Sequence, residues 1–530
     1  MQKWKKRDHQ YFVNLIYPAV VFGVAGGCLT AAAVALYKAL AGQAVRLSGE
    51  IYSFLRGNPA WIPAALAVLA VLSALLTACY RRHPNLHGGG IPTSVGILRG
   101  LISFHWLHNL AGVAALSMTA FLTGVPLGTE GPAVQIGTAL GRGSLGAMRK
   151  KHRAWERYAM TGGACAGFTV ATGAPISGLL FAVEEAHRSV SPMILMVSSV
   201  AVLSAEITSE LISPLLGVSP RLFDRMSLPI LQMGDMWIPL AVGVAVGLFS
   251  VAVLRLYGKI RGFFNRTLRR VPQWMRIFLV LAATLAAGLW SHSMISTGHH
   301  LVEELFALDV PVLMLICILL VRTLLTLSAS SNGITGGLFL PLMALGAILA
   351  ALTAEGLVRI GLHESFCGIV IMLGITACIA GMMKTPLTAV AFSIEVLSLS
   401  GNVLPVLLAA VSSYVITEIF SAQSINDTVL ETRMEEIHEG RPVQICLGAA
   451  AVLPGSFAVG KQVRDVLWPD GLIVMALRHS GEEDRLDVRG DTVLQAGDAL
   501  ELRCSTQNMQ EAQKEIVGIL GEQELNWREE

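Results

Sequence analysis

Long stretches without charged side chains constrain the fold of this chain more than any other feature. Asp, Glu, Lys and Arg are absent from residues 61–80, 101–129, 158–183, 277–297, 323–354 and 366–383. Several of these stretches reach the roughly 20 residues that a helix needs to cross the hydrocarbon core of a bilayer. Charged residues make up only 14% of the whole chain, well below the level of soluble domains. The sequence therefore predicts a helical protein that crosses a lipid bilayer many times.

Basic residues are clustered between the apolar stretches, at Lys3–Arg7, Arg81–Arg82, Arg149–Arg153 and Lys259–Arg270. The positive-inside rule places such clusters on the cytoplasmic side of a membrane. We therefore expect a protein of a prokaryotic inner or plasma membrane with both termini in the cytoplasm. It would begin with a cytoplasmic tail at residues 1–10, which lacks a signal-peptide pattern. The net charge of +2 gives no indication of a nucleic-acid partner.

No pattern in the sequence indicates an enzyme or a metal protein. The eight cysteines form no CxxC or Cys/His metal spacing, so we expect neither disulfides nor a structural metal. His299 and His300 are adjacent, but neighbouring residues do not share a helix face and no other ligand is near. We interpret them as a loop or interfacial pair. The sequence shows no nucleophile–base set, metal cluster or phosphate loop, and we expect no cofactor.

The composition of the chain changes near residue 421. The preceding part is apolar and rich in Gly and Ala, whereas a charged linker, residues 431–442, leads to a segment of ordinary soluble composition, residues 443–526. That segment is long enough for one modest core. We predict a small α/β domain with strands at Gln444–Leu453, Gly471–Arg478 and Asp498–Arg503 and helices at Lys461–Trp468 and Asn508–Leu520.

The membrane part contains an internal repeat. Two patterns occur twice in the same order: Pro175-x-Ser177-xxx-Phe181-xx-Glu184 recurs as Pro386-x-Thr388-xxx-Phe392-xx-Glu395, and Gly128-xxx-Pro132-xxxx-Gly137 recurs as Gly337-xxx-Pro341-xxxx-Gly346. The nearly equal offsets indicate two related halves, residues 11–215 and 230–430, and leave open whether these are parallel or inverted. Gly/Pro-interrupted apolar stretches at matching positions are typical of a transporter with its site at the middle of the membrane.

Three motifs place glycines and a proline before an apolar helix: Gly88-Gly89-Gly90-Ile91-Pro92, Gly128-Thr129-Glu130-Gly131-Pro132 and Gly336-Gly337-Leu338-Phe339-Leu340-Pro341. Proline suits the first helical turn and glycine bares the backbone N–H groups. A helix N-terminus carries a partial positive charge of roughly +0.5. One such turn alone favours an ordinary helix break. Three, two of them related by the repeat, predict an anion site without a full positive charge.

Glu130 is a candidate for coupling protons to anions. It lies inside the second motif, in a stretch without other charges, and a carboxylate within a membrane is by default a functional hypothesis. At a helix N-terminus its carboxylate can occupy the place of the anion, and when protonated it can swing away. The alternative is a capping glutamate with a structural role.

Glu185 is the second candidate. Its neighbour Glu184 matches Glu395 by the repeat, so we interpret those two as structural partners. The position that matches Glu185 is Val396, which singles Glu185 out. We predict that it transfers protons nearer the cytoplasm, on a path apart from the anion. The alternative is a helix-end pair at the membrane interface.

Together and in this order, the three motifs resemble those of the CLC family of chloride channels and chloride/proton exchangers, over about residues 11–430. The resemblance implies an all-α polytopic fold with two inverted repeats and broken helices, and a homodimer with one pore in each subunit. It implies that Glu130 is the gating glutamate. It also implies that Glu185 is the internal proton-transfer glutamate, which channels usually lack. The anion-binding residues would be Gly89, Gly90, Ile91, Gly131, Leu338, Phe339, Leu340 and Asn426.

This sequence departs from the family pattern at three positions. Gly89 stands where many members have serine, Thr129 where many have arginine, and Asn426 where a tyrosine usually faces the anion. We therefore predict a central site that is weaker and less selective for chloride. Fluoride stays open as the anion, although fluoride-exporting relatives generally lack the internal glutamate.

The C-terminal segment resembles the C-terminal domain of potassium-conductance regulators, the TrkA C-terminal type. The resemblance rests on Gly490-Asp491-xx-Leu494-xx-Gly497-Asp498-x-Leu500 and a β-α-β layout. Such domains dimerise, and some bind small ligands, including cyclic dinucleotides. We expect a regulatory domain that hangs in the cytoplasm after the last pore helix and passes movement to Asn426.

We therefore predict a secondary active transporter that exchanges chloride or a similar anion for protons. The alternatives are a passive anion channel of the same fold and a fluoride/proton antiporter. A cation transporter with a regulatory tail is more distant, because the chain has no carbonyl-filter motif such as TVGYG.

Overall fold

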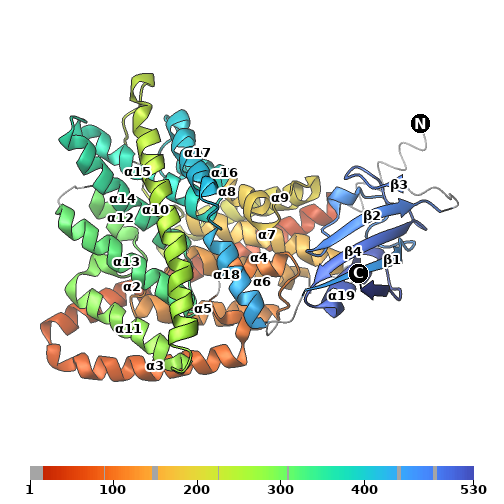
Figure 1. The fold of residues 1–530 in the computed structure, drawn as a ribbon, viewed down its shortest axis with the longest axis horizontal. Coiled ribbons are helices and arrows are strands. Elements are labelled where there is room, and N and C mark those ends of the chain that lie inside the picture. The colour runs from red at the N-terminus through yellow and green to blue at the C-terminus, as the bar shows by residue number, and fades with distance from the viewer. Residues whose placement is uncertain are drawn as a thin grey trace.

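The structure is a computed structural model that describes residues 16–88, 90–145, 153–224, 226–306, 310–437, 443–480 and 486–529. Helices form most of the molecule, and a small α/β domain lies at one end of its longest axis (Figure 1). Among the described residues, eight helices are long and apolar enough to cross a membrane. The prediction of a polytopic helical protein followed by an α/β domain is confirmed.

The helices of the first half are α2 (Tyr17–Gly57), α3 (Ile62–Arg82), α4 (Ile91–Leu98), α5 (Trp106–Leu122), α6 (Glu130–Ser144), α7 (Arg153–Thr172), α8 (Pro175–Phe181) and α9 (Pro192–Ile212). Those of the second half are α10 (Trp237–Gly262), α11 (Gln273–Trp290), α12 (His299–Leu305), α13 (Val312–Ser331), α14 (Phe339–Arg359), α15 (Cys367–Met383), α16 (Pro386–Glu395), α17 (Val403–Ile419) and α18 (Ile425–Ile437). The predicted linker at 431–442 therefore begins inside α18, and residues 438–442 and the predicted tail at 1–10 lie outside the described residues.

Uncharged stretches do not correspond one-to-one to helices. The stretch 158–183 is divided where α7 ends and α8 begins at Pro175, after Gly173 with a φ of 72°. The stretch 323–354 is divided in the same way between α13 and α14. A positive φ suits glycine, and proline suits the first turn of the new helix, so the backbone chemistry sets the breaks.

The two halves are inverted repeats. Gly128 and Gly337, which match by the repeat, form an antiparallel bridge, with N···O distances of 2.7 and 2.8 Å in the two directions. Equivalent residues can exchange reciprocal bonds only if the two segments are related by a local two-fold axis. The bridge agrees with the inverted repeats that the family resemblance implies.

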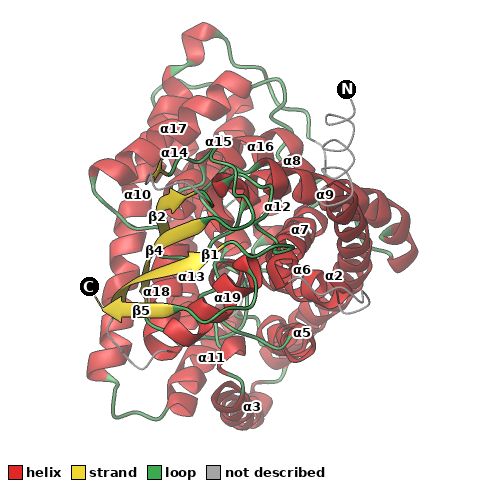
Figure 2. Ribbon diagram, turned by 90° about the vertical axis from the view of Figure 1, so that its right-hand side faces the viewer, coloured by secondary structure: helices red, strands yellow, loops and turns green. Residues whose placement is uncertain are grey.

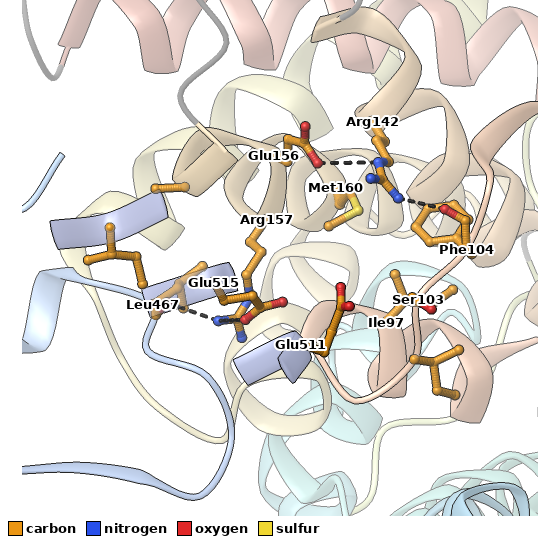
Figure 3. A pocket seen from close by; sticks show the side chains of 14 residues that line it. Ile97, Ser103, Phe104, Arg142, Glu156, Arg157, Met160, Leu467, Glu511 and Glu515 are labelled. Atoms are coloured by element: carbon orange, nitrogen blue, oxygen red, sulfur yellow. Dashed lines mark hydrogen bonds and ion pairs between the residues drawn. The ribbon is translucent and has the colours of Figure 1, made fainter. Parts of the chain in front are cut away.

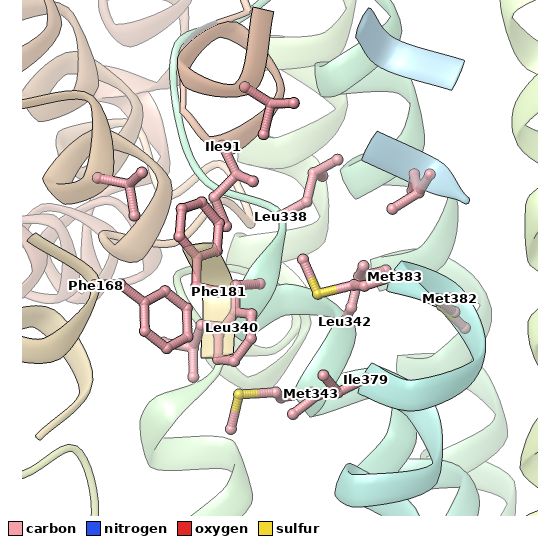
Figure 4. Close-up of a cluster of buried hydrophobic side chains, with 14 of the residues drawn as sticks. Ile91, Phe168, Phe181, Leu338, Leu340, Leu342, Met343, Ile379, Met382 and Met383 are labelled. Carbon is pink, nitrogen blue, oxygen red and sulfur yellow. The ribbon is translucent and has the colours of Figure 1, made fainter. Parts of the chain in front are cut away.

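Glycines bring helices of each half into backbone contact. A Cβ at Gly137 of α6 would lie 2.0 Å from the carbonyl oxygen of Gly163 of α7, and one at Gly163 would lie 2.1 Å from that of Gly137. In the second half, Gly346 of α14 and Gly374 of α15 approach one another's carbonyls in the same manner. Small residues allow such close packing between membrane helices. Figure 4 shows the apolar side chains, among them Phe168 and Leu340, that fill the space between the halves.

The α/β domain is a five-stranded antiparallel sheet in the order β3-β2-β4-β1-β5 with one helix (Figure 2). Its elements are β1 (Gln444–Ala451), β2 (Leu472–Arg478), β3 (Leu486–Asp487), β4 (Ala499–Thr506), α19 (Met509–Leu520) and β5 (Asn526–Glu529). The predicted helix at Lys461–Trp468 is wrong. Only a 3₁₀ turn forms there, because Val463 and Arg464 donate their N–H groups to the carbonyls of Thr492 and Gly490 instead. β3 and β5 were not predicted.

The α/β domain is docked against the membrane helices. The expectation from the sequence, a domain that hangs free after the last pore helix, is therefore wrong. Nη1 of Arg157 on α7 donates to the carbonyl oxygens of Leu467 and Trp468, both at 2.9 Å. The hydroxyl of Tyr158 donates to the carbonyl oxygen of Asp465 at 2.5 Å. Figure 3 shows Arg157, Leu467 and Glu515 beside a cavity of about 190 Å³ between the two parts.

Candidate functional site

The three glycine motifs meet in the middle of the membrane part. The bridge between Gly128 and Gly337 holds together the segments that lead into α6 and α14. A Cβ at Gly131 would lie 2.7 Å from the Cα of Gly337 and 3.1 Å from the Cα of Gly90. Only glycine fits three backbones this close. The N-termini of α4, α6 and α14 therefore converge, as the sequence predicts.

A cavity of about 10 Å³ lies at this meeting point. A volume of this size holds about one particle of the size of a water molecule. Of the predicted anion-binding residues, Ile91, Leu338, Phe339 and Asn426 line it, whereas Gly90, Gly131 and Leu340 are not among its lining residues. Gly89 lies outside the described residues.

The backbone amide of Gly90 already has a partner. Its N–H donates to Oε1 of Gln135 at 2.5 Å, and Gln135 is fully buried on α6. Gly90 has a φ of 99°, which favours glycine. Sequence reasoning missed Gln135, although an amide side chain one helical turn into an apolar helix that begins with an anion motif was a usable signal.

Glu130 is the first residue of α6 and is fully buried. Its Oε1 accepts from the Thr129 hydroxyl at 3.2 Å, and its Oε2 has no partner that meets hydrogen-bond geometry. The backbone amides of Glu130 itself and of Leu340 interact with the carboxylate. A Cβ at Gly128 would lie 2.4 Å from Oε2, so the glycine leaves room for the carboxylate. The carboxylate thus lies between the N-termini of α6 and α14.

Glu185 lies in a π-helical turn, Ala182–Ala186, that continues from α8, and it is 3% exposed. Its Oε1 accepts from Nδ2 of Asn426 at 3.1 Å. Asn426 is 2% exposed, and its Oδ1 is buried without a partner. Because Asn426 also lines the small cavity, one side chain touches both the predicted proton group and the predicted anion position.

Arg99 holds the backbone at Glu185 in place. Its Nη2 donates to the carbonyl oxygen of Glu185 at 3.0 Å and its Nε to that of Ala186 at 2.9 Å. On the other side, the carbonyl of Arg99 accepts from the N–H of Asp470 in the α/β domain at 3.3 Å. Sequence reasoning missed Arg99, whose signal was a lone positive charge directly after the apolar helix of the first motif.

Glu184 and Glu395 cap helices of the opposite half. The Glu184 carboxylate accepts from the N–H groups of Leu387 and Thr388 at the start of α16, at 2.8 and 2.7 Å. The Glu395 carboxylate accepts from those of Ile176 and Ser177 at the start of α8, at 2.7 and 2.9 Å. The two glutamates are structural partners through this reciprocal exchange, in agreement with the interpretation of the repeat.

One group of the described residues has the composition of a metal site. Nδ1 of His299 lies 3.7 Å from Oε1 of Glu303, and Nδ1 of His300 lies 3.4 Å from Oε2 of the same carboxylate. The expectation that no further ligand lies near this histidine pair is therefore wrong, because a turn of helix α12 brings Glu303 back to both. His299 also shares a hydrogen bond with the carbonyl of Leu222 at 2.5 Å.

The fold and this site define a membrane transport protein, not an enzyme: helix N-termini from both halves converge in its middle, and the carboxylate of Glu130 is buried between two of them. The family described as voltage gated chloride channel matches residues 68–418, and the chain belongs to it. A second family, described as TrkA-C domain, matches residues 447–517 of the α/β domain.

Curated relatives cover most of the chain. The H(+)/Cl(-) exchange transporter ClcA of Klebsiella pneumoniae is 26% identical over 381 residues, which is 70% of this chain and 79% of that protein. The protein of the same name from Salmonella paratyphi B is 26% identical over 444 residues, which is 81% of this chain and 90% of that protein.

Solved structures share the fold. The structure of a slow cyanobacterial Cl-/H+ antiporter superposes with a TM-score of 0.70 at 21% identity, over 79% of this chain and 98% of that one. The structure of a CLC-type fluoride/proton antiporter superposes with a TM-score of 0.61 at 18% identity, over 76% of this chain and 96% of that one.

Proposed function

We propose that this protein exchanges chloride or a similar anion for protons across the membrane. The observation that carries the proposal is the Glu130 carboxylate, which is fully buried between the N-termini of α6 and α14. The segment that leads into α14 also lines the small cavity, through Gly337 and Leu338. Helix N-termini attract anions, so a carboxylate in that position competes with a transported anion. The curated relatives named above, which are exchangers of protons and chloride, support the same activity.

The competition at Glu130 gives one half of the mechanism. When ionised, the carboxylate holds the position between the helix ends, and the anion is excluded. When protonated, it loses the attraction of the two helix N-termini and leaves the position to an anion. Each exchange of carboxylate for anion thus takes up or releases a proton.

Glu185 and Asn426 give the other half. An ionised Glu185 accepts the hydrogen bond from Nδ2 of Asn426, as the structure has it, and leaves Oδ1 without a partner. A protonated Glu185 can instead donate to Oδ1, and the amide then turns Nδ2 toward the cavity. An anion in the cavity is therefore stabilised when Glu185 carries a proton. This arrangement favours an exchanger over the passive channel.

Fluoride is the second candidate anion. Gly89 and Asn426 replace the serine and tyrosine that the family resemblance assigns to chloride contacts, and the CLC-type fluoride/proton antiporter named above shares the fold. The same transport assay separates the two anions.

The test is a transport assay in liposomes that contain the purified protein. With an outward-directed anion gradient and no pH gradient, the wild type should drive protons inward, and parallel runs with chloride, nitrate and fluoride rank the anions. Glu130→Ala should abolish proton coupling, and Glu185→Gln should abolish proton flux while anion flux persists. Glu364→Gln, at an exposed position, serves as the control.

Three outcomes would each contradict a part of this proposal. Anion flux without proton flux in the wild type would make the protein a channel. Flux that follows potassium rather than the anion would make it a cation transporter. Full coupling in Glu130→Ala would remove the proposed role of the buried carboxylate.

We also propose that the protein is a homodimer that uses the faces of α8, α9, α16 and α17. The carboxylate-capped starts of α8 and α16 lie at this surface, with Ile176 58% and Leu387 55% exposed beside them. On α9 and α17, large apolar side chains such as Leu211 and Ile419 are exposed. Ionised carboxylates are costly against lipid, and a second copy of the chain would cover them.

The α/β domain is proposed to regulate transport from the cytoplasm, the side on which we place both termini. The backbone N–H of its Asp470 donates a hydrogen bond to the carbonyl oxygen of Arg99, and the guanidinium of Arg99 donates to the carbonyl oxygen of Glu185. Movement of the domain would therefore reach Glu185 directly, and the cavity of about 190 Å³ beside Arg157 offers space for a small ligand. Loss of the domain to a protease added outside intact cells would contradict the cytoplasmic placement.

A further inference from the structure

A second cavity, of about 420 Å³, lies at the end of the membrane part that carries the α/β domain. It is lined by the end of α3 and the start of α5: Arg82, His83, Pro84, Asn85, Leu86, Ser103, Phe104, His105, His108 and Asn109. Ser103 and Phe104 also line the cavity at the α/β domain, so the two cavities lie on either side of one loop.

A buried donor without a partner faces this cavity. Asn109 is 3% exposed, and its Nδ2 makes no hydrogen bond. The orientation of the amide is fixed by a chain of bonds. The Gly90 N–H requires Oε1 of Gln135 as its acceptor, at 2.5 Å, so Nε2 of Gln135 is the donor to Oδ1 of Asn109, at 3.0 Å. Nδ2 of Asn109 therefore has no acceptor within the described residues. A buried donor without a partner destabilises the folded state.

The start of helix α5 adds further donors. His105 is the N-cap residue, and no side chain caps the helix end. The first N–H groups of a 17-residue helix therefore stay available beside His108 and Asn109. Helix N-termini of this kind bind phosphate groups.

Cationic and N–H-bearing side chains complete the lining, which contains no carboxylate. The His105 and His108 rings lie 4.5 Å apart and the His83 and His108 rings 5.9 Å apart, measured between centroids. Arg82 lines the same cavity. An imidazole offers at least one N–H donor in either protonation state. A metal ion needs ligand atoms that lie close to one another. Among the described residues, the nitrogens of these three histidines do not all lie within 4.8 Å of one another, so they are not arranged around one metal ion.

From these donors we propose that the cavity binds a phosphate-bearing molecule. Its volume is far larger than that of the small cavity lined by Leu338 and Asn426, and every charged lining group is a donor, which suits a multivalent oxyanion with an organic part against Phe104. Occupancy at Asn109 is transmitted through Gln135 to the amide of Gly90, at the start of α4. This second step rests on the proposed anion exchange, whereas the binding itself does not.

Binding is tested on the purified full-length protein in detergent, by equilibrium dialysis with inorganic phosphate, AMP and dioctanoyl phosphatidic acid. The first two probes represent free phosphates and the third a lipid headgroup. We expect saturable binding of at least one probe, weakened about tenfold or more in His105→Ala/His108→Ala and in Asn109→Ala. His363→Ala, at an exposed position elsewhere, should bind as the wild type.

Each outcome decides a part of the proposal. Binding of phosphatidic acid alone identifies a lipid headgroup as the ligand, and binding of AMP or phosphate identifies a free phosphate. No saturable binding of any probe, or binding unchanged in both cavity variants, overturns the proposal. Zn²⁺ binding that the histidine variants abolish, without phosphate binding, would replace it with a metal site. The double histidine variant changes only exposed side chains, so it remains informative if Asn109→Ala fails to fold.

Discussion

At the scale of single residues, Asn426 connects the two chemistries of the protein. The resemblance assigned it to the anion in place of a tyrosine. The structure shows that its Nδ2 is bonded to Glu185 while its Oδ1 has no partner beside the cavity. A tyrosine hydroxyl can only donate to the anion. The side-chain amide of Asn426 can rotate by half a turn, which exchanges the positions of its donor Nδ2 and its acceptor Oδ1. Asn426 is therefore expected to make anion binding depend on the protonation of Glu185.

Replacement of Asn426 by leucine should uncouple the two fluxes. Hydrogen bonds to charged groups contribute roughly 1.5–3 kcal/mol, so we expect coupled proton flux to fall about tenfold or more. Anion flux should persist, because the helix N-termini remain. The measurement is the ratio of proton to anion flux in liposomes, with Asn58→Leu as the control at an exposed position. An unchanged ratio in Asn426→Leu would show that Asn426 takes no part in coupling.

At the scale of elements, the two halves hold one another by their helix ends. Glu184 of the first half caps α16, and Glu395 of the second half caps α8, with matching hydroxyl contacts to Thr388 and Ser177 at 2.7 and 2.8 Å. Each carboxylate satisfies N–H groups that would otherwise lie unpaired near lipid. The inverted repeat is thus stabilised by two equivalent helix caps across it, each of three hydrogen bonds.

Glu184→Ala and Glu395→Ala should destabilise the protein by similar amounts. Loss of a helix cap costs about 0.5–2 kcal/mol, and the symmetry of the two sites makes each variant the control for the other. Thermal unfolding in detergent measures the effect, and proton coupling of the surviving protein should stay intact in both. If only Glu184→Ala lost proton flux, Glu184 would belong to the proton path together with Glu185.

At the scale of the whole molecule, the α/β domain and the membrane part form a continuous structure. Glu515 of α19 lies against Gly100, where a Cβ would be 2.6 Å from the carboxylate oxygens, and Gly100 has a φ of 78°. Only glycine suits both the conformation and the contact. Together with Arg157 and Arg99, this contact ties the domain to the segment that ends α4.

A chain that ends at residue 437 should remain a dimer but transport at a different rate. The proposed dimer faces lie on α8, α9, α16 and α17, which the truncation leaves intact, whereas the bond between Asp470 and Arg99 is lost. Chemical cross-linking measures the dimer, and the liposome assay measures the rate, with the full-length protein as the control. A monomeric full-length protein would contradict the dimer, and an unchanged rate with every ligand tested would contradict the regulatory role.

The sequence by itself determined the polytopic helical class, the two related halves, the three anion motifs and the candidates Glu130 and Glu185. These depend on local chemistry: apolar length for spans, glycine and proline for helix breaks, and the cost of an isolated carboxylate in a membrane. The pairing of Glu184 with Glu395 was also predictable, because the repeat marks equivalent residues.

Only the tertiary structure decided which side chains meet. The contact between Asn426 and Glu185 joins residues 241 positions apart, and the bond that occupies the Gly90 amide comes from Gln135 on another helix. The predicted helix at Lys461–Trp468 failed for the same reason, because its backbone pairs with a distant segment. Local patterns record the propensity of a segment, whereas its partners are chosen when remote segments are packed together. The fold class and the candidate carboxylates were therefore readable from the chain, and the link between anion and proton was not.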